Sequence, residues 1–408
     1  MSRSAAWRVF AFALALRLGL LLATPTKDIM VGDATEYDPI AVNLLAGRGF
    51  AITPGIPTPA RAPVFPLFLA GVYAVFGHSV PAALASQAVL SAATCVLLLW
   101  FMGETVEDER AARLAAWLLA AHPIMIVYSC RLISETLFTS LLAASMLFLA
   151  RYQRREKPAE LAASGVLLGL ATLTRPGGML MPAVVLGLLL LEGRRHLLPW
   201  LGYAAAFAVV LAPWSLRNKE LFGFATLTAH GPGYGFYVTG HMTEGMTYDE
   251  ARAMYSAVTL EPEYQERPFE KGHSPLAELE KRLSREGVGL IKTHPIGYAA
   301  IVLRRFCPFW VTSHSGVIGV EQPLSQYRRE GRWGPILVRL SLLALQGAII
   351  AAALWGAWSL RGRPRALLTL AAVPAYMTIH IVFDMVPRYH LPAMPYLLAL
   401  AAVALPPP

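Results

Sequence analysis

The sequence has 408 residues, of which 56% are hydrophobic and 15% charged. A soluble domain carries about a quarter charged residues, so this composition, with a mean hydropathy of +0.49, excludes a soluble multidomain protein and indicates a polytopic membrane protein. Lysine and arginine (35) exceed aspartate and glutamate (26), but no basic run with interleaved aromatics lies outside the apolar segments, which argues against nucleic-acid binding. We attribute the excess to topogenic arginines and to a site for an anionic ligand.

Apolar windows of the length of a membrane helix recur along the chain and predict about ten transmembrane helices. They cover residues 7–23, 81–102, 111–128, 132–150, 160–174, 177–191, 197–213, 334–360, 365–384 and 390–405. The first window lacks a cleavage site, so we expect a retained span, with Arg17 snorkelling outward or paired within the bundle. A further apolar stretch at 62–77 is short and opens with two prolines, so a surface helix competes with a span.

Arginine-rich loops set the orientation. With the N-terminus cytoplasmic and 62–77 on the membrane surface, the clusters at 151–157, 194–195 and 361–365 are all cytoplasmic, as the positive-inside rule requires. Counting 62–77 as a span would place these clusters outside. We therefore predict a multi-pass protein of the plasma (inner) membrane whose functional site faces the outside or periplasm.

This topology divides the chain into three regions. Residues 1–213 form a transmembrane module with a long outer loop at 24–80, residues 214–333 form a small, mainly helical outer cap, and residues 334–408 form the C-terminal transmembrane helices.

The informative polar residues all fall at outer helix ends or in outer loops. They are Asp33, Glu36, Arg61, Arg131, Glu135, Arg175, Arg217, Asn218, Asp384, Arg388 and His390. Charged groups near the bilayer are costly unless they face one another or a wet cavity. We therefore expect a shared outer pocket that contains both carboxylates and arginines.

Two of these arginines differ in how well a structural role explains them. Arg175 lies in a short turn before Pro176 and two glycines, where a neutral residue would serve, so it indicates a bound anion. Arg217 follows Trp214 at the end of a window, where anchoring at the membrane surface is an equally good explanation.

Metal and redox chemistry have little support in the sequence. No histidine pattern has ligand spacing, although Asp33, Glu36 and Asp38 together offer oxygen ligands for a divalent cation. We expect no cofactor. Three cysteines are too few for a disulfide framework, which leaves open whether Cys130 and Cys307 are bridged.

Six motifs, in this order, resemble the GT-C glycosyltransferases that use polyprenyl-phosphate sugars, above all the protein mannosyltransferases, the aminoarabinose transferases of lipid A and the lipopolysaccharide sugar transferases of rhizobia. The motifs are GDATEYDPIAVNLLAGRGF at 32–50, RAPVFPLFLAGVYAVFG at 61–77, YSCRLISETLFTSLL at 128–142, GLATLTRPGGMLMP at 169–182, PWSLRNKELFG at 213–223 and PRYHLPAMPYLLAL at 387–400. The resemblance implies an all-α GT-C bundle in which 62–77 is a juxtamembrane helix of the first outer loop. The chain departs from the relatives in having Ala34 after Asp33 and Ala60 before Arg61.

The resemblance also implies roles for particular residues. Asp33 matches the family's catalytic acid, Glu135 matches a second acidic position, and Arg61 matches a basic residue before the proline-containing helix. Because transfer from a lipid phosphate needs a base and cations, we expect Asp33 to be the general base, with Glu135 orienting, and Arg61, Arg175 and Arg388 to bind the phosphate. Further candidate pocket residues are Glu36, Tyr37, Arg131, Arg217, Asn218, Tyr389 and His390.

The expected activity is transfer of a hexose or pentose from a polyprenyl-phosphate donor to an envelope lipid, glycan or protein, with inversion. The alternatives are a carrier or flippase for a lipid-linked envelope precursor and a non-catalytic envelope-assembly subunit. A carrier is expected to show charges at the bilayer midplane and related halves, whereas here the polar groups gather at one face. A non-catalytic subunit would not need Asp33.

Overall fold

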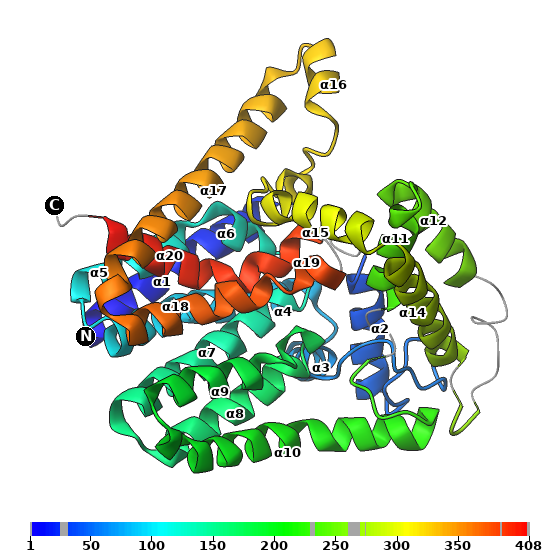
Figure 1. Cartoon of the computed structure of the whole chain (residues 1–408), viewed down its shortest axis with the longest axis horizontal. Helices are drawn as coiled ribbons and strands as arrows, with labels where there is room; N and C mark the ends of the chain where they lie inside the picture. The colour runs from blue at the N-terminus through cyan, green and yellow to red at the C-terminus, as the bar shows by residue number, and fades with distance from the viewer. Residues whose placement is uncertain are drawn as a thin grey trace.

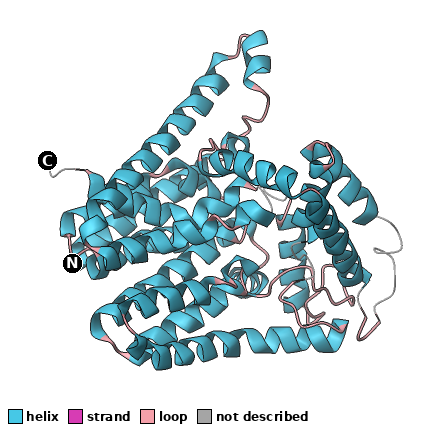
Figure 2. Ribbon diagram, in the orientation of Figure 1, coloured by secondary structure: helices cyan, strands magenta, loops and turns pink. Residues whose placement is uncertain are grey.

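The computed structural model describes residues 2–24, 32–228, 233–259, 270–273, 275–383 and 386–405. Regular structure in these ranges is helical, apart from one isolated bridge between Ala51 and Pro57 in the first outer loop (Figure 2). The expected all-α fold is confirmed. Asp384 and the three terminal prolines lie outside the described residues.

The helices can be grouped by the three predicted regions, although α10 continues past the predicted boundary at residue 213 to Phe222. The N-terminal module contains α1 (Arg3–Ala23), α2 (Ala34–Leu45), α3 (Val64–Phe76), α4 (Val80–Thr105), α5 (Glu109–Ala121), α6 (Pro123–Ser129), α7 (Glu135–Arg155), α8 (Pro158–Thr172), α9 (Met181–Glu192) and α10 (Leu197–Phe222). The outer region contains α11 (Gly233–Thr243), α12 (Tyr248–Thr259), α14 (Pro275–Thr293), α15 (Pro295–Trp310) and α16 (Leu324–Arg329). The C-terminal region contains α17 (Trp333–Ser359), α18 (Pro364–Met377), α19 (His380–Phe383) and α20 (Met394–Ala404), with the 3₁₀ helix η6 (Pro387–Ala393) before α20.

Each of the ten apolar windows contains a helix, but the helices differ in length. Within the described ranges, five helices are long and apolar enough to cross a membrane, or six if α5 and α6, which meet at a bend of 56°, form one span. Helices α8, α9 and α20 have only 15, 12 and 11 residues. The chain is a multi-pass membrane protein, and the count of ten spans stays a prediction.

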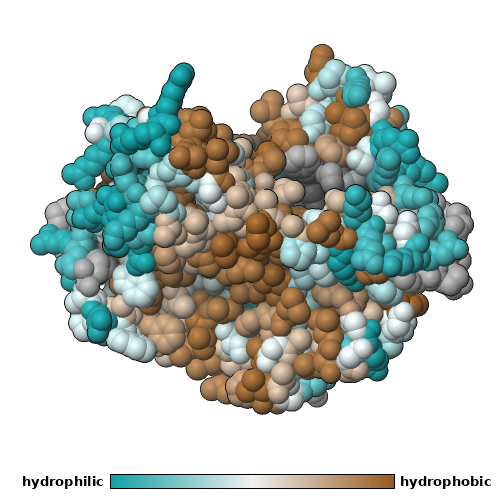
Figure 3. All heavy atoms as spheres, turned by 90° about the horizontal axis from the view of Figure 1, so that it is seen from below, coloured by the Kyte–Doolittle hydropathy of each residue, from teal (hydrophilic) through white to brown (hydrophobic). Residues whose placement is uncertain are grey.

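The two ends of the molecule are hydrophilic and the middle is apolar. Both termini lie at one end in Figure 1, and the helices α11, α12 and α14 lie at the other. In Figure 3 apolar residues cover the middle of the face and hydrophilic residues gather at these two ends. Such a band is what a bilayer-spanning bundle presents to lipid. Helix α3, in the first outer loop, has 13 residues and is about 20 Å long, too short to cross the roughly 30 Å hydrocarbon core, as expected for a juxtamembrane helix.

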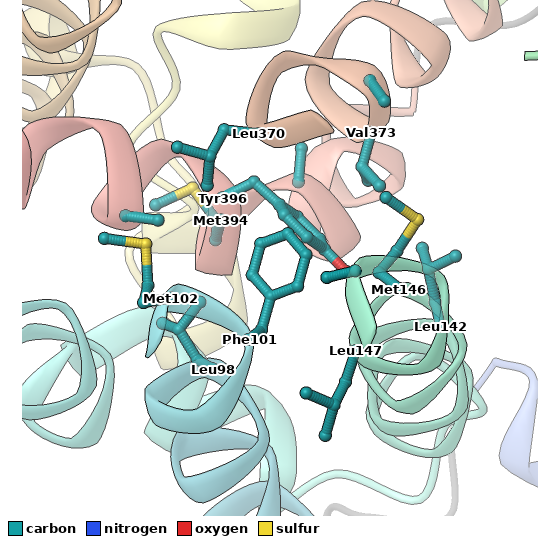
Figure 4. Packing of buried hydrophobic residues seen from close by; sticks show 14 of the residues in the cluster. Leu98, Phe101, Met102, Leu142, Met146, Leu147, Leu370, Val373, Met394 and Tyr396 are labelled. Carbon is teal, nitrogen blue, oxygen red and sulfur yellow. The ribbon is translucent and has the colours of Figure 1, made fainter. Parts of the chain in front are cut away.

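The core joins the N-terminal and C-terminal transmembrane helices. Side chains of α4, α7, α18 and α20 interdigitate there (Figure 4), and Phe101 packs edge-on against Tyr396 with ring centroids 5.5 Å apart. Helix α20 is buried along most of its length. This packing holds η6, immediately before α20, against the N-terminal module. As a result, Arg388 in η6 lies next to Asp33 and Glu135.

Arg17 is paired within the bundle, one of the two alternatives expected for it. It is 1% exposed; its Nε donates to Ser91 Oγ at 2.8 Å and its Nη1 to the carbonyls of Ala13 and Ala120 at 2.9 and 3.0 Å. The Ala120 carbonyl lies in the last turn of α5, where the bend into α6 removes helical partners. Arg17 thus caps that bend. Cys130 and Cys307 are not bridged; all three cysteines are free.

The outer region is built around a close crossing of α11 and α14. Gly240 lies against Gly287, and a Cβ at position 240 would lie 2.8 Å from the Gly287 carbonyl oxygen, while one at position 287 would overlap the Phe236 backbone. Glycine lets the two backbones meet.

Candidate active site

Six charged side chains from distant parts of the sequence meet in one cluster. Asp33 immediately precedes α2, Glu36 is in its first turn, Arg61 lies in the loop before α3, Glu135 begins α7, Arg175 follows α8, and Arg388 lies in η6. We call these six residues the ion-pair cluster. It contains three carboxylates and three guanidinium groups, so their formal charges balance.

Asp33 is held by two arginines, one on each carboxylate oxygen. Arg61 Nη2 donates to Oδ1 at 3.0 Å and Arg388 Nη2 donates to Oδ2 at 2.8 Å. The Asp33 side chain is 16% exposed. Burial raises the pKa of Asp33, but the positive charges of Arg61, Arg388 and Arg175 outweigh it, and the net pKa is below its ordinary value. Asp33 is therefore ionised at neutral pH, and both of its oxygens are engaged.

Arg61 forms its tightest contact with Glu36. Its Nε donates to Glu36 Oε2 at 2.8 Å and its Nη2 to Oε1 at 3.1 Å, the bidentate geometry that suits a guanidinium and a carboxylate. The same guanidinium lies over the ring of Tyr37, 5.0 Å from its centroid. Glu36 is therefore an ion-pair partner of Arg61, in addition to being near the predicted pocket.

Glu135 is the most deeply buried member of the ion-pair cluster. It is 2% exposed, and its Oε1 lies 2.8 Å from Arg175 Nη1 and 3.2 Å from Arg388 Nε. Its place in the first turn of α7 favours a negative charge, because the helix N-terminus carries partial positive charge. Arg388 therefore bridges the two carboxylates predicted to act together: its Nη2 contacts Asp33 and its Nε contacts Glu135.

Ser134 connects two sides of the cluster and was not singled out from the sequence. Its Oγ accepts a hydrogen bond from Arg175 Nη1 at 3.1 Å and lies 3.2 Å from the hydroxyl of Tyr37. Arg175 also stacks on Tyr389, 5.2 Å from the ring centroid. Tyr37 and Tyr389 thus line the cluster through arginine contacts. The only sequence signal for Ser134 was its position directly before Glu135.

Four candidate pocket residues lie outside the ion-pair cluster. Arg131 Nη2 donates to the Val317 carbonyl at 2.5 Å. Arg217 donates to the Thr58 carbonyl at 3.2 Å and lies over the Trp214 ring, which supports the anchoring alternative. The other two are fully buried and bind backbone: Asn218 donates to the Thr226 carbonyl at 2.7 Å, and His390 Nδ1 lies 2.6 Å from the Phe309 carbonyl oxygen.

The three carboxylates considered for a cation do not come together. Asp38 faces the other way on α2, where it accepts from the Tyr73 hydroxyl at 2.6 Å and lies 2.9 Å from His78 Nε2. Asp33 and Glu36 share the Arg61 guanidinium instead of a metal ion. Across the described ranges no three His, Cys, Asp or Glu side chains are placed to ligate a metal. This donor set does not fit a resident cation.

Comparison with known proteins bears on the fold and on part of the sequence. The model of the dolichyl-phosphate-mannose-protein mannosyltransferase family matches residues 60–216, a stretch that includes Arg61, Glu135 and Arg175. No curated protein matches the chain.

Two solved structures are similar to the chain. One is the archaeal oligosaccharyltransferase AglB from Archaeoglobus fulgidus in complex with an inhibitory peptide and a dolichol-phosphate, with a TM-score of 0.57 and 14% sequence identity. The match covers 97% of this chain but only 50% of AglB, so this chain spans about half the length of AglB. ArnT from Cupriavidus metallidurans bound to undecaprenyl phosphate gives a TM-score of 0.47 at 16% identity, covering 99% of this chain and 78% of ArnT. The chain thus has the fold of the GT-C glycosyltransferases, as its motifs predicted, and residues 60–216 match the protein mannosyltransferase family.

Proposed function

We propose that the protein is an integral membrane glycosyltransferase that moves a sugar from a polyprenyl-phosphate donor to an envelope acceptor at the outer face of the membrane. The observation that carries this proposal is the ion-pair cluster, in which two predicted catalytic carboxylates and three arginines meet from five separate segments. Its position at the end of the bundle near the helical cap, away from both termini, supports an outer site (Figure 1).

The proposed reaction is one direct displacement. Asp33 takes the proton from an acceptor hydroxyl, whose oxygen attacks the anomeric carbon of the sugar. The bond between that carbon and the phosphate oxygen breaks with inversion, and polyprenyl phosphate leaves with the bonding electrons. Arginine is suited to the phosphate, because its planar fork binds two oxygens at once. Arg388 and Arg175 bind the leaving phosphate, Arg61 supports Asp33, and Glu135 keeps Arg175 and Arg388 in position.

A lipid-linked donor suits this location better than a nucleotide sugar. In the proposed topology Arg388, which is 28% exposed, lies at headgroup depth, where the phosphate of a lipid would lie while its chain remains in the bilayer. No glycine-rich phosphate loop is present in the sequence.

The test is sugar transfer by purified protein in native envelope lipids, with a radiolabelled undecaprenyl-phosphate hexose as the donor. Asp33→Asn is expected to lower turnover by about 10²-fold or more, the usual scale for a positioned general base. Asp38→Asn is the matched control, because it removes a carboxylate from the same helix outside the cluster. Near-normal turnover in Asp33→Asn with an inactive Glu135→Gln would reverse the two roles. Activity in both variants, or transfer from a nucleotide sugar without polyprenol, would defeat the proposal.

A further inference from the structure

The charged side chains of the proposed site are paired with one another. We propose that the donor phosphate takes Arg388 from Asp33 and that this exchange of anions frees Asp33 to act as the base; the inference rests on the proposed function. The carboxylate is then available to an acceptor only after the donor has bound, so donor binding comes first.

The guanidinium groups of the ion-pair cluster are already paired with its carboxylates. Each of the three arginines lies within 3.2 Å of at least one carboxylate oxygen of the cluster. Because the three arginines and three carboxylates neutralise one another, a phosphate gains a guanidinium partner most directly by taking it from one of these carboxylates.

Asp33 is the carboxylate best placed to be replaced. Glu36 holds Arg61 with two hydrogen bonds, and Glu135 is 3% exposed in its side chain and lies at a helix N-terminus. Asp33 makes one bond to each of two arginines, is more exposed than Glu135 (16% against 3%), and precedes the first turn of α2. Releasing Arg388 leaves Asp33 tethered to Arg61 through Oδ1 and frees Oδ2, so the same step opens a guanidinium for the phosphate and an oxygen for a proton.

Arg388 can make this exchange without leaving its place. Its Nε lies 3.2 Å from Glu135 Oε1, while its Nη2 contacts Asp33 at 2.8 Å. The Nε contact keeps the side chain anchored as the Nη2 atom changes partner from a carboxylate oxygen to a phosphate oxygen. Both are anionic oxygens that a guanidinium binds with similar geometry.

Binding of undecaprenyl phosphate alone, which needs no turnover, tests the exchange. The dissociation constant is measured in nanodiscs for the wild type, Asp33→Asn, Arg388→Ala and the double variant. If Asp33 competes for Arg388, then Asp33→Asn binds the lipid about tenfold more tightly, since a charge-assisted hydrogen bond of about 1.5 kcal/mol or more no longer has to be broken. The gain falls below twofold in the Arg388→Ala background, because the two residues are coupled.

Two controls separate the exchange from simpler effects. Asp38→Asn removes a nearby negative charge without freeing an arginine and should change binding by less than twofold. Asp33→Ser serves if Asp33→Asn does not fold. Unchanged or weaker binding in the Asp33 variants, or an equal gain with and without Arg388, overturns the exchange. Absence of any specific lipid binding by the wild type overturns the proposed function itself, whereas binding without the gain overturns the exchange alone.

Discussion

Replacing Arg175 by alanine should destabilise the protein much more than replacing an equally close arginine at the surface. The ion pair between Arg175 and Glu135 is 2.8 Å long with side chains 18% and 3% exposed, and the pair between Arg195 and Glu156 is 2.7 Å long with side chains 65% and 51% exposed. The two pairs match in distance and differ in burial. Any difference in their contribution therefore reports the cost of leaving a carboxylate alone in the protein interior.

The magnitude follows from what remains after the substitution. Removing one member of a buried ion pair costs about 3–5 kcal/mol; the low end applies here, because Glu135 keeps Arg388 Nε at 3.2 Å. At about 2 °C per kcal/mol, Arg175→Ala should lower Tm by about 6 °C. An exposed pair contributes at most about 1 kcal/mol, so Arg195→Ala should lower Tm by about 2 °C or less.

The assay is tryptophan-fluorescence melting of the two variants in the same detergent. A third variant, Arg175→Met with Glu135→Gln, removes both charges and should recover at least half of the loss, as expected when a buried pair is replaced by neutral groups. Equal shifts for Arg175→Ala and Arg195→Ala would refute the reasoning. So would a double variant less stable than Arg175→Ala alone.

Two further predictions concern the cap and the orientation. Gly287→Ala should destabilise the crossing of α11 and α14 by about 1–3 kcal/mol and increase proteolysis of the cap. The control, Gly289→Ala, has open space around its Cβ position and should be neutral or stabilising by up to about 1 kcal/mol. Equal effects of the two substitutions would contradict the close approach of the helices. In a cysteine-free variant, single cysteines at the exposed positions Arg154 and Arg252 should label oppositely with an impermeant thiol reagent on intact cells, and labelling of both would contradict the predicted topology.

Hydropathy was enough to locate the apolar helices of the bundle, because membrane burial selects apolar windows whatever their partners, but it did not locate helices such as α2, α11 and α14. It did not distinguish a helix that faces lipid from one buried by other helices. Helix α20 has 11 residues and is buried along most of its length, whereas α10 is 26 residues long and mostly exposed. A helix surrounded by protein does not need the full thickness of the bilayer, so window counts and span counts diverge.

The pairing within the site was only partly readable from the sequence. Asp33 and Glu36 are three residues apart at the start of α2 and face the same way, which helical spacing implies, while Asp38 is five residues from Asp33 and faces Tyr73. The choice of Arg61 as their common partner depends on how the loop before α3 folds back. Ser134 gave no signal beyond its position before Glu135, since the role of a single hydroxyl depends on the arginine and tyrosine that contact it.

The balanced charge of the ion-pair cluster follows from its location. Three arginines gathered for a phosphate would be unstable near the bilayer when no ligand is bound, because an unpaired charge there is costly. Carboxylates from other elements, at the starts of α2 and α7, supply the missing counter-charge, at 2.8 to 3.2 Å from the guanidinium groups. The base in our proposal is one of these counter-ions. The arginines that need Asp33 as a counter-ion also lower its pKa. In the proposed mechanism Asp33 is therefore a weak base until the donor phosphate takes over Arg388.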